Sequence, residues 1–231
     1  EAPLAGFCSM DPDGFAGFSS IAKNFSKIDE HNKNLEPGEA EQNMKELYDS
    51  LVKSNVSKYS QKSNSDSIEG RYVFVALQIP TDVVAGLAWI DGISLLEQVV
   101  AHYADSPIKV VVKRHPYCGS MSVQQTIDKL ETKGLVEVST NSVHNLISDA
   151  ETVFVVNSGV GLEALLHNKP VVVSGKCDYL YAVTSVQTAE QLKEELENTP
   201  AHDAKKTGLF LHFYRTQYLV EADDKAGITS K

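Results

Sequence analysis

The chain has 231 residues, of which 21 are basic and 31 acidic, so its formal net charge at pH 7 is −10. Hydrophobic residues make up 42% and charged residues 23%, a composition typical of folded globular proteins that argues against wholesale disorder. The acidic balance argues against a general nucleic-acid binder, which needs a clustered basic face. The sequence has no apolar run of the roughly 20 residues that a membrane-spanning helix needs, and no signal-peptide pattern.

Three cysteines, Cys8, Cys118 and Cys177, are an odd number and have no metal-ligand spacing. They predict free thiols in a reducing compartment, and therefore a cytoplasmic protein. The seven histidines include no pair with the HExxH spacing of a zinc site. We accordingly expect neither a metal nor a cofactor.

Residues 1–70 form the first of two expected regions. The first 25 residues are rich in glycine and phenylalanine and predict an ordered loop. Apolar residues then recur with helical spacing from Glu39 to Lys53, which predicts an amphipathic helix. Residues 54–67 (SNVSKYSQKSNSDS) are mostly serine and asparagine and offer almost nothing to bury, so they predict a linker or a long loop.

Residues 71–231 form the second region, where short β-branched runs alternate with helical segments. The five expected strands are 71–77, 108–112, 135–138, 152–156 and 170–173. The expected helices are 92–103, 122–132, 143–148, 160–167, 188–197 and 203–219. Near-continuous apolar strands separated by helices are typical of a parallel sheet that is buried on both faces. The sequence therefore predicts an α/β fold with a doubly wound, parallel, Rossmann-like sheet.

Polar side chains follow the carboxyl ends of four of these strands. In open parallel sheets, ligands bind beyond this edge, where loops and helix N-termini converge. The side chains that the pattern brings there are Gln78, Asp82, Lys113, Arg114, His115, Pro116, Asn157, Ser158, Gly159, Glu163, Lys176 and Tyr179. Their common edge predicts a ligand site with a local basic group in an otherwise acidic chain.

The run NSGVGLEALL (157–166) lies at a strand-to-helix junction and is the strongest local signal. Its small residues leave backbone N–H groups exposed at the positive end of a helix dipole, which favours an anion such as phosphate. It is neither a P-loop nor a GxGxxG turn. The alternative is a tight turn whose glycines permit close packing. In that alternative Glu163 is a surface helix residue, whereas at a nucleotide site it accepts hydrogen bonds from ribose hydroxyls.

Three other residues each leave two interpretations open. His115 is either a structural histidine or a hydrogen-bond donor to a phosphate or a leaving group. Arg114 beside it is either a phosphate ligand or a solvated charge. Asp82 either caps the next helix or turn, as aspartate commonly does, or faces the substrate as a nucleophile or base.

The order of these motifs resembles that of a known family. The elements strand–ALQIPTD, strand–VKRHP and SDAETVFVVNSGVGLEALLHNKPVVVSGKCDY resemble bacterial capsule-polysaccharide biosynthesis enzymes. More narrowly, they resemble the retaining β-Kdo transferases of capsule and O-antigen assembly, where Kdo is 3-deoxy-D-manno-oct-2-ulosonic acid. The resemblance covers roughly residues 70–185 and extends weakly into DPDGFAGFSS and SKYSQ. The His-Pro and Ser-Gly elements are also similar to those of the GT-B sialyltransferases, which use CMP-sugars.

The resemblance implies two sets of functional residues. Asp82, with Gln78 before it, matches the carboxylate proposed as nucleophile in the retaining enzymes, and His115 would stabilise the leaving phosphate. The expected catalytic residues are therefore Asp82, His115 and Gln78. The residues expected to bind the donor are His115 and Pro116 at its phosphate, Ser158 and Gly159 at the phosphate-binding helix, Glu163 near its ribose, and Lys113, Arg114, Asn157, Lys176 and Tyr179 around them.

The resemblance also implies that residues 71–231 are the donor-binding half of a GT-B glycosyltransferase. Such an enzyme has two Rossmann-like halves, and residues 1–70 are too short to build the acceptor half. We expect them to be a partial acceptor-side region joined by the serine-rich linker. The chain is therefore expected to be either a piece that lacks most of that half or a reduced form of the fold. The absence of a starting methionine agrees with a processed form or an excised piece.

The leading hypothesis is a metal-independent transferase that moves Kdo from CMP-Kdo to a bacterial surface-polysaccharide or lipid-linked glycan. The alternatives are a transferase for another CMP-sugar such as CMP-sialic acid, a non-catalytic nucleotide-sugar-binding module of a polysaccharide assembly complex, and a Rossmann-like domain with no ligand. Members of the family act at the inner face of the cytoplasmic membrane, which implies a cytoplasmic or peripheral membrane location.

Overall fold

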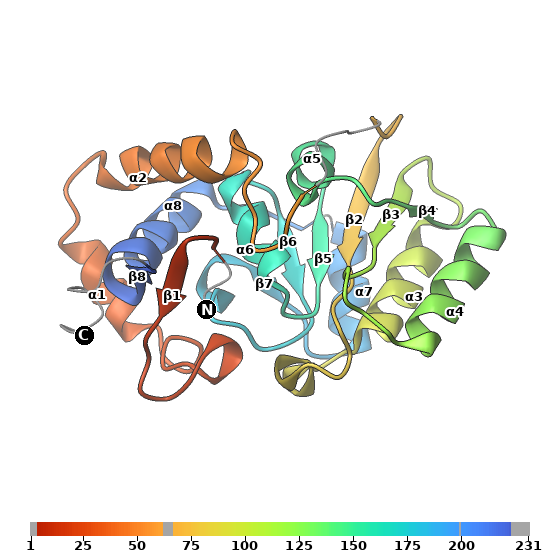
Figure 1. The fold of residues 1–231 in the computed structure, drawn as a ribbon, viewed down its shortest axis with the longest axis horizontal. Coiled ribbons are helices and arrows are strands. Elements are labelled where there is room, and N and C mark those ends of the chain that lie inside the picture. The colour runs from red at the N-terminus through yellow and green to blue at the C-terminus, as the bar shows by residue number, and fades with distance from the viewer. Residues whose placement is uncertain (1–3, 62–66, 199, 223–231) are drawn as a thin grey trace.

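The computed structural model describes residues 4–61, 67–198 and 200–222, so residues 62–66 of the predicted linker lie outside the described part. Its centre is a six-stranded parallel sheet with helices on both faces (Figure 1). From edge to edge the strands are β4 (Glu137–Val138), β3 (Lys109–Lys113), β2 (Tyr72–Ala76), β5 (Val153–Val155), β6 (Val171–Val173) and β7 (Thr184–Ser185). The predicted doubly wound Rossmann-like sheet is confirmed.

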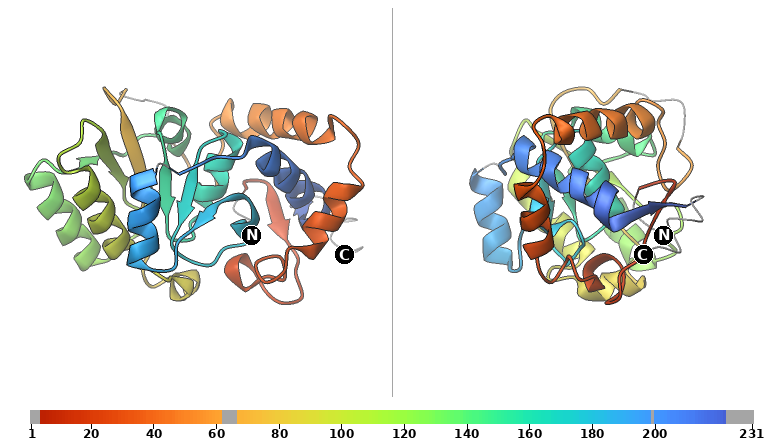
Figure 2. Two further views of the ribbon diagram at one scale, coloured as in Figure 1. Left: turned by 180° about the vertical axis from the view of Figure 1, so that it is seen from behind. Right: turned by 90° about the vertical axis from the view of Figure 1, so that its left-hand side faces the viewer.

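Alternate residues of each strand supply two separate cores, one on each face of the sheet. On β2, Phe74 packs into one core, whereas Val73 and Val75 pack into the other. The second core lies under α3 (Gly92–Tyr103), α4 (Met121–Thr132) and α7 (Ala189–Asn198), and α7 lies in front of the sheet in the view from behind (Figure 2, left). The first core lies under α5 (Val143–Asp149) and α6 (Gly159–Leu166). Each large apolar side chain buried in this way stabilises the fold by roughly 1.5–3 kcal/mol.

The sequence prediction missed three short strands and a 3₁₀ helix. The sheet has a sixth strand, β7, whose two residues are polar and too few to form an apolar pattern. The first 25 residues, expected to be a loop throughout, contain β1 (Phe7–Ser9) and the 3₁₀ helix η1 (Ala16–Phe18). β1 pairs antiparallel with β8 (Leu219–Glu221), so its partner comes from the other end of the chain, where local sequence patterns cannot reveal it.

Helices from the two ends of the chain lie side by side. The predicted helix from Glu39 to Lys53 is present as α2 (Glu39–Leu47), which continues as the π-helical turn η2 (Tyr48–Val52). Near the other end, α8 (Ala204–Phe213) continues as the π-helical turn η5 (Tyr214–Tyr218). α8 packs against α2 and against α1 (Ser26–Lys33) (Figure 2, right). The predicted division of the chain at residue 70 stays a prediction.

The N-terminal segment also contacts the loops at the carboxyl edge of the sheet. Gly17 in η1 lies against the loop that follows β6, where a Cβ atom at residue 17 would be 2.2 Å from the carbonyl oxygen of Lys176. The same Cβ would be 2.7 Å from a methyl group of Leu87, at the end of the 3₁₀ helix η3 (Val83–Leu87). Only glycine permits this approach of one backbone to another.

Replacing Gly17 by alanine should therefore destabilise the protein by about 1–3 kcal/mol, because two backbone segments have to separate. The matched control is Gly86→Ala in η3, where an added Cβ meets no atom within 4 Å and the expected change is within about 0.5 kcal/mol. Urea denaturation measures both. Equal unfolding midpoints for the two variants would show that η1 does not pack tightly on this edge.

Candidate functional site

The candidate site lies at the carboxyl edge of the sheet, where the strand order reverses. Along the chain the strands run outward from β2 through β3 to β4, and then start again beside β2 with β5, β6 and β7. This is the order of dinucleotide-binding folds, in which ligands bind in the crevice outside the strand ends at the reversal point. The loops that follow β2 and β5 therefore form the centre of the site.

Two of the predicted residues, Gln78 and Asn157, bridge this reversal point. The side-chain nitrogen Nε2 of Gln78 donates to Oδ1 of Asn157 at 2.8 Å, and the backbone N–H of Asn157 donates to the side-chain oxygen Oε1 of Gln78 at 3.3 Å. Nδ2 of Asn157 donates to the backbone oxygens of Val84 at 2.7 Å and Lys176 at 3.2 Å. Asn157 is 5% exposed, and its side-chain groups are all engaged by the protein. These hydrogen bonds indicate that the pair positions the loops around the site.

Asp82 is the N-cap of η3 and lies in the exposed loop after β2. Its Oδ1 accepts a hydrogen bond from the backbone N–H of Val84 at 3.1 Å, and its own backbone is extended. The interpretation of Asp82 as a cap is therefore correct. The carboxylate nevertheless acts beyond its own loop, because its negative charge favours the protonated form of His115 and so raises the pKa of that imidazole.

His115 lies in the loop after β3 and is half-buried. Its Nδ1 accepts a hydrogen bond from the backbone N–H of Tyr117 at 3.2 Å, so in the neutral ring the proton is on Nε2. Burial lowers the pKa of His115 below 6.5, the nearby charge of Lys58 lowers it further, and Asp82 opposes both. Near neutral pH the imidazole is thus uncharged, with Nε2–H available as a donor.

The cations predicted around His115 are directed largely toward the protein. Arg114 donates to the side-chain oxygen of Gln124 at 2.6 Å and to the backbone oxygen of Ser120 at 3.2 Å, so it braces the N-terminus of α4. The ammonium group of Lys113 donates to the backbone oxygen of Asn141 in the loop before α5. Pro116 is exposed in the loop itself. Arg114 is therefore neither a solvated charge nor directed at the reversal point.

Three residues form or support the N-terminus of α6. Ser158 is its N-cap, with Oγ accepting from the backbone N–H of Val160 at 3.3 Å, and Gly159 is the first helical residue. Tyr179 lies behind this terminus, 1% exposed, and its hydroxyl donates to the backbone oxygen of Ser158. A Cβ atom on Gly161 would be 2.5 Å from that hydroxyl, so the glycine at this position is required by packing. Tyr179 thus supports the predicted phosphate-binding turn from inside the core.

Glu163 is buried on α6, and the interpretation of it as a surface helix residue is wrong. It is 5% exposed, and burial raises the pKa of its carboxyl group to about 7. The side chain of Ser57 and the charge of Lys113 lie near it, and both lower the pKa. The sequence does carry a signal for this burial, because α6 is apolar on all sides apart from Glu163.

The segment from residue 55 to residue 61, predicted to be part of a linker, contributes side chains that the sequence analysis missed. The ring of Tyr59 lies edge-on to the His115 imidazole, with centroids 4.9 Å apart and planes at 87°. Tyr59 also contacts Tyr117 at 5.6 Å, and Ser57 contacts Glu163. The weak family resemblance of SKYSQ was the available sequence signal that this segment belongs to the site. Its polar residues have no periodicity and therefore predict no contacts.

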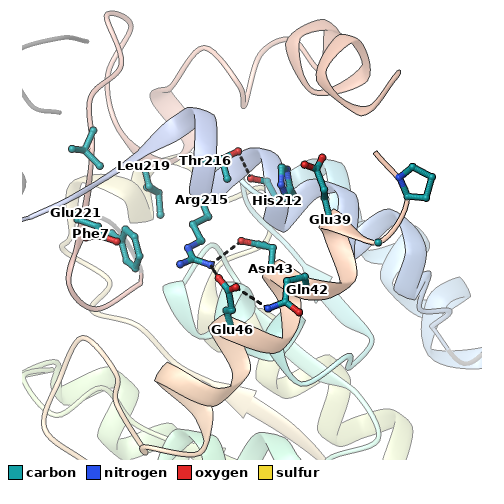
Figure 3. Close-up of a pocket in the computed structure, with 13 residues that line it drawn as sticks. Phe7, Glu39, Gln42, Asn43, Glu46, His212, Arg215, Thr216, Leu219 and Glu221 are labelled. Atoms are coloured by element: carbon teal, nitrogen blue, oxygen red, sulfur yellow. Dashed lines mark hydrogen bonds and ion pairs between the residues drawn. The ribbon is translucent and has the colours of Figure 1, made fainter. Parts of the chain in front are cut away.

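A cavity of about 820 Å³ lies away from this edge, between α2 and the α8–η5 junction (Figure 3). Arg215 crosses its wall and donates to Oδ1 of Asn43 at 3.1 Å and to the Glu46 carboxylate at 2.8 Å. None of the predicted site residues lines it. In the described residues, no helix is long and apolar enough to cross a membrane. Nor does that part of the chain bring together three or more side chains of the kinds that ligate metals.

The fold and the edge described above define a Rossmann-like α/β protein whose candidate ligand site is at the reversal point of its sheet. The chain belongs to the family described as capsule polysaccharide biosynthesis protein, whose model matches residues 20–220. The predicted resemblance is confirmed at this level. No curated protein sequence matches the chain.

Two solved structures from Thermosulfurimonas dismutans have a similar fold. The structure of KpsC, beta Kdo 2,7 transferase, is 18% identical with a TM-score of 0.62, over 98% of this chain and 71% of that chain. The structure of KpsC, beta Kdo 2,4 transferase, is 18% identical with a TM-score of 0.60, over 95% of this chain and 68% of that chain. The likeness shows that the chain shares the fold of β-Kdo transferases.

The geometry around His115 gives a prediction for its titration. NMR of the imidazole should give a midpoint below 6.5, because the site is partly desolvated. Asp82→Asn should lower the midpoint further, because it removes the carboxylate that favours the imidazolium while keeping an N-cap side chain. The exposed Asp105→Asn is the control. An unchanged His115 midpoint in Asp82→Asn would show that the two groups do not interact.

Glu163 predicts a pH dependence of stability. Because folding raises its pKa from 4.5 to about 7, the unfolded chain releases this proton at lower pH than the folded chain. The contribution of Glu163 to stability should therefore fall as pH rises from 4.5 to about 7, by up to roughly 3 kcal/mol. Glu163→Gln should remove this contribution and leave those of the other buried groups, which include the opposite contribution of His167, whose pKa is lowered to about 3. The unfolding free energy of the unchanged protein minus that of Glu163→Gln should thus fall over this pH range. Urea denaturation between pH 5 and 8 measures the unfolding free energy of each protein, with the exposed Glu131→Gln as the control. Parallel pH profiles for the unchanged protein and both variants would contradict the prediction.

Proposed function

We propose that this chain is a glycosyltransferase of bacterial surface-polysaccharide assembly that transfers Kdo from CMP-Kdo with retention of configuration. The observation that carries the proposal is the placement of Asp82 and His115 in the loops that follow the adjacent strands β2 and β3, at the same edge of the sheet where α6 begins. A carboxylate, a neutral hydrogen-bond donor and a helix N-terminus are the groups that retaining transfer from a nucleotide-sugar needs. The family and the shared fold support the same class of reaction.

In the proposed reaction the phosphate of CMP-Kdo lies between Nε2–H of His115 and the N-terminus of α6. Both are positive ends of dipoles, and both stabilise the charge that develops on CMP as its phosphate oxygen leaves with the bonding electron pair. Neither requires a metal ion, so we propose metal-independent departure. Glu163 is placed one turn inside α6, where its carboxyl group can accept a hydrogen bond from a ribose hydroxyl.

Asp82 is the proposed nucleophile. A carboxylate oxygen attacks the anomeric carbon while CMP departs from the opposite face, which gives a covalent glycosyl-enzyme. A hydroxyl of the glycan acceptor then attacks the same carbon, transfers its proton to solvent water and displaces the Asp82 carboxylate. Two inversions retain the configuration. Gln78 and Asn157 hold the loop that carries Asp82 and so act as positioning residues.

The acceptor is proposed to be a surface-polysaccharide or lipid-linked glycan, and the protein is proposed to act on it in the cytoplasm or at the inner face of the cytoplasmic membrane. The proposal for the acceptor rests on the family, since the described residues at the sheet edge account for the donor alone.

Transfer of Kdo from CMP-Kdo to a glycan acceptor tests the proposal. Asp82→Asn should reduce transfer to background, because the amide caps η3 but is no nucleophile, and His115→Ala should lower turnover about 10²–10⁴-fold. The matched control is Asp203→Asn, an aspartate that caps α8 in the same way far from the sheet edge. Full activity in Asp82→Asn or His115→Ala would overturn these roles.

Calorimetry with nucleotides separates the remaining alternatives. Binding of CMP without transfer from any CMP-sugar would favour a non-catalytic module of a polysaccharide assembly complex. Transfer from CMP-sialic acid in place of CMP-Kdo would keep the class of reaction and change the donor. Preference for a purine nucleotide would contradict both.

A further inference from the structure

Residues 55–61, which we call the strap, are fastened at both ends to the N-terminus of α5. At one end, Oδ1 of Asn55 accepts from the hydroxyl of Ser142. At the other, the side-chain oxygen of Gln61 accepts from the backbone N–H of Val143 at 2.9 Å, which caps the helix. A segment whose composition predicts a free linker is therefore held in place by side-chain hydrogen bonds.

A pair of histidines adds a third attachment. Nε2 of His144 lies 2.8 Å from the backbone oxygen of Val56 and donates to it, because a carbonyl can only accept. Nδ1 of His144 is then an acceptor in the neutral ring, and Nε2 of His167, 3.0 Å away, donates to it. Burial lowers the pKa of both rings, that of His167 to about 3, so the pair stays neutral and its hydrogen bonds have a defined direction.

Between these attachments the strap contacts the two ligand-binding groups that lie on either side of the reversal point. Tyr59 packs edge-on against the His115 imidazole at 4.9 Å, and its backbone oxygen accepts from the Gln61 amide at 2.7 Å. Ser57, two residues before it, lies near the buried carboxyl group of Glu163 and lowers the pKa of that group. One short segment thus touches the loop after β3 and the first turns of α6.

The contact with Tyr59 restricts rotation of the His115 imidazole. Nδ1 of His115 is held by the backbone N–H of Tyr117, and the rings of Tyr59 and Tyr117 lie against the imidazole at angles of 87° and 51°. Rotation of the ring would break the hydrogen bond and the edge contact together. The remaining polar atom, Nε2, is left to meet a ligand.

We propose that the strap is the positioning element of the donor site, with Tyr59 orienting the imidazole of His115 and Ser57 orienting the carboxyl group of Glu163. The importance of those two groups for transfer rests on the proposed function, whereas their dependence on the strap does not. Because only two residues separate the strap from the end of η2, the N-terminal helices would then influence the geometry at the sheet edge.

The experiment compares Tyr59→Leu with Tyr59→Phe, which keeps the ring. The control is Tyr103→Leu, since Tyr103 lies edge-on to a different histidine, His102, at 4.7 Å. NMR titration of His115 reads the burial of the ring without any ligand. Tyr59→Leu should move its midpoint up toward 6.5 because the imidazole becomes more solvated, whereas Tyr59→Phe and Tyr103→Leu should leave it unchanged.

Calorimetry with CMP gives the second measurement. Tyr59→Leu should weaken CMP binding about tenfold, corresponding to about 1.4 kcal/mol. Tyr59→Phe, which keeps the ring, should bind CMP as tightly as the unchanged protein. Ser57→Ala, a conservative change with little risk to folding, should weaken CMP binding in the same direction while leaving the His115 midpoint in place.

The outcomes separate this proposal from the proposed function. If the His115 midpoint is the same in Tyr59→Leu and in the unchanged protein, the strap does not position His115 and the proposal is wrong. If the midpoint shifts as expected but the unchanged protein does not bind CMP, the positioning role of the strap is supported and CMP-Kdo as the donor is contradicted. Normal CMP binding by both Tyr59→Leu and Ser57→Ala would contradict the positioning role of the strap and leave the proposed donor unaffected.

Discussion

The arrangement of the sheet edge depends on one buried side chain, Asn157. It follows β5 at the point where the two halves of the sheet meet, and its hydrogen bonds reach the loop after β2, the start of η3 and the loop after β6. An amide can do this because it donates twice and accepts at the same time. Asp82 is carried by one of the loops so held, and α6 begins immediately after Asn157. A carboxylate or an aliphatic side chain there would leave buried carbonyl groups without donors, at a cost of roughly 1–3 kcal/mol each.

The central strands β2, β3, β5 and β6 could be predicted because they consist largely of apolar β-branched and aromatic residues, whose burial on both faces leaves a clear pattern. The pattern also placed the candidate residues on the correct edge, since the carboxyl ends of parallel strands share one side. It could not show that Arg114 turns toward α4 or that Tyr179 supports α6 from behind, because both depend on tertiary packing. The contacts of Ser57 and Tyr59 were equally hidden, since polar residues in an irregular segment follow no period.

The basic residues at the sheet edge, which the sequence analysis expected to bind the phosphate of a ligand, are engaged mainly by the protein itself. Lys113 and Arg114 hold neighbouring loops through backbone and amide oxygens, and His115 is a neutral donor near pH 7. The edge thus offers an anion mainly dipoles in fixed orientations, from an imidazole N–H and a helix N-terminus. Such groups need no reorganisation when charge develops on a ligand, which is the property that favours a transition state over a ground state. A site of this kind is compatible with a strongly acidic chain.

The pairing of β1 with β8 has a consequence for how the protein folds. Phe7 lies opposite Glu221, so the two strands meet only after nearly the whole chain has been brought into a closed loop. Contacts with such large sequence separation are entropically costly and form slowly, whereas the β-α-β units of the sheet are local. Gly17 contacts the sheet edge from η1, which lies between β1 and α1, so we expect η1 to pack on this edge after the sheet has formed. A partly folded chain would have the strands and helices of the sheet in place and yet lack the packing of η1 on the sheet edge.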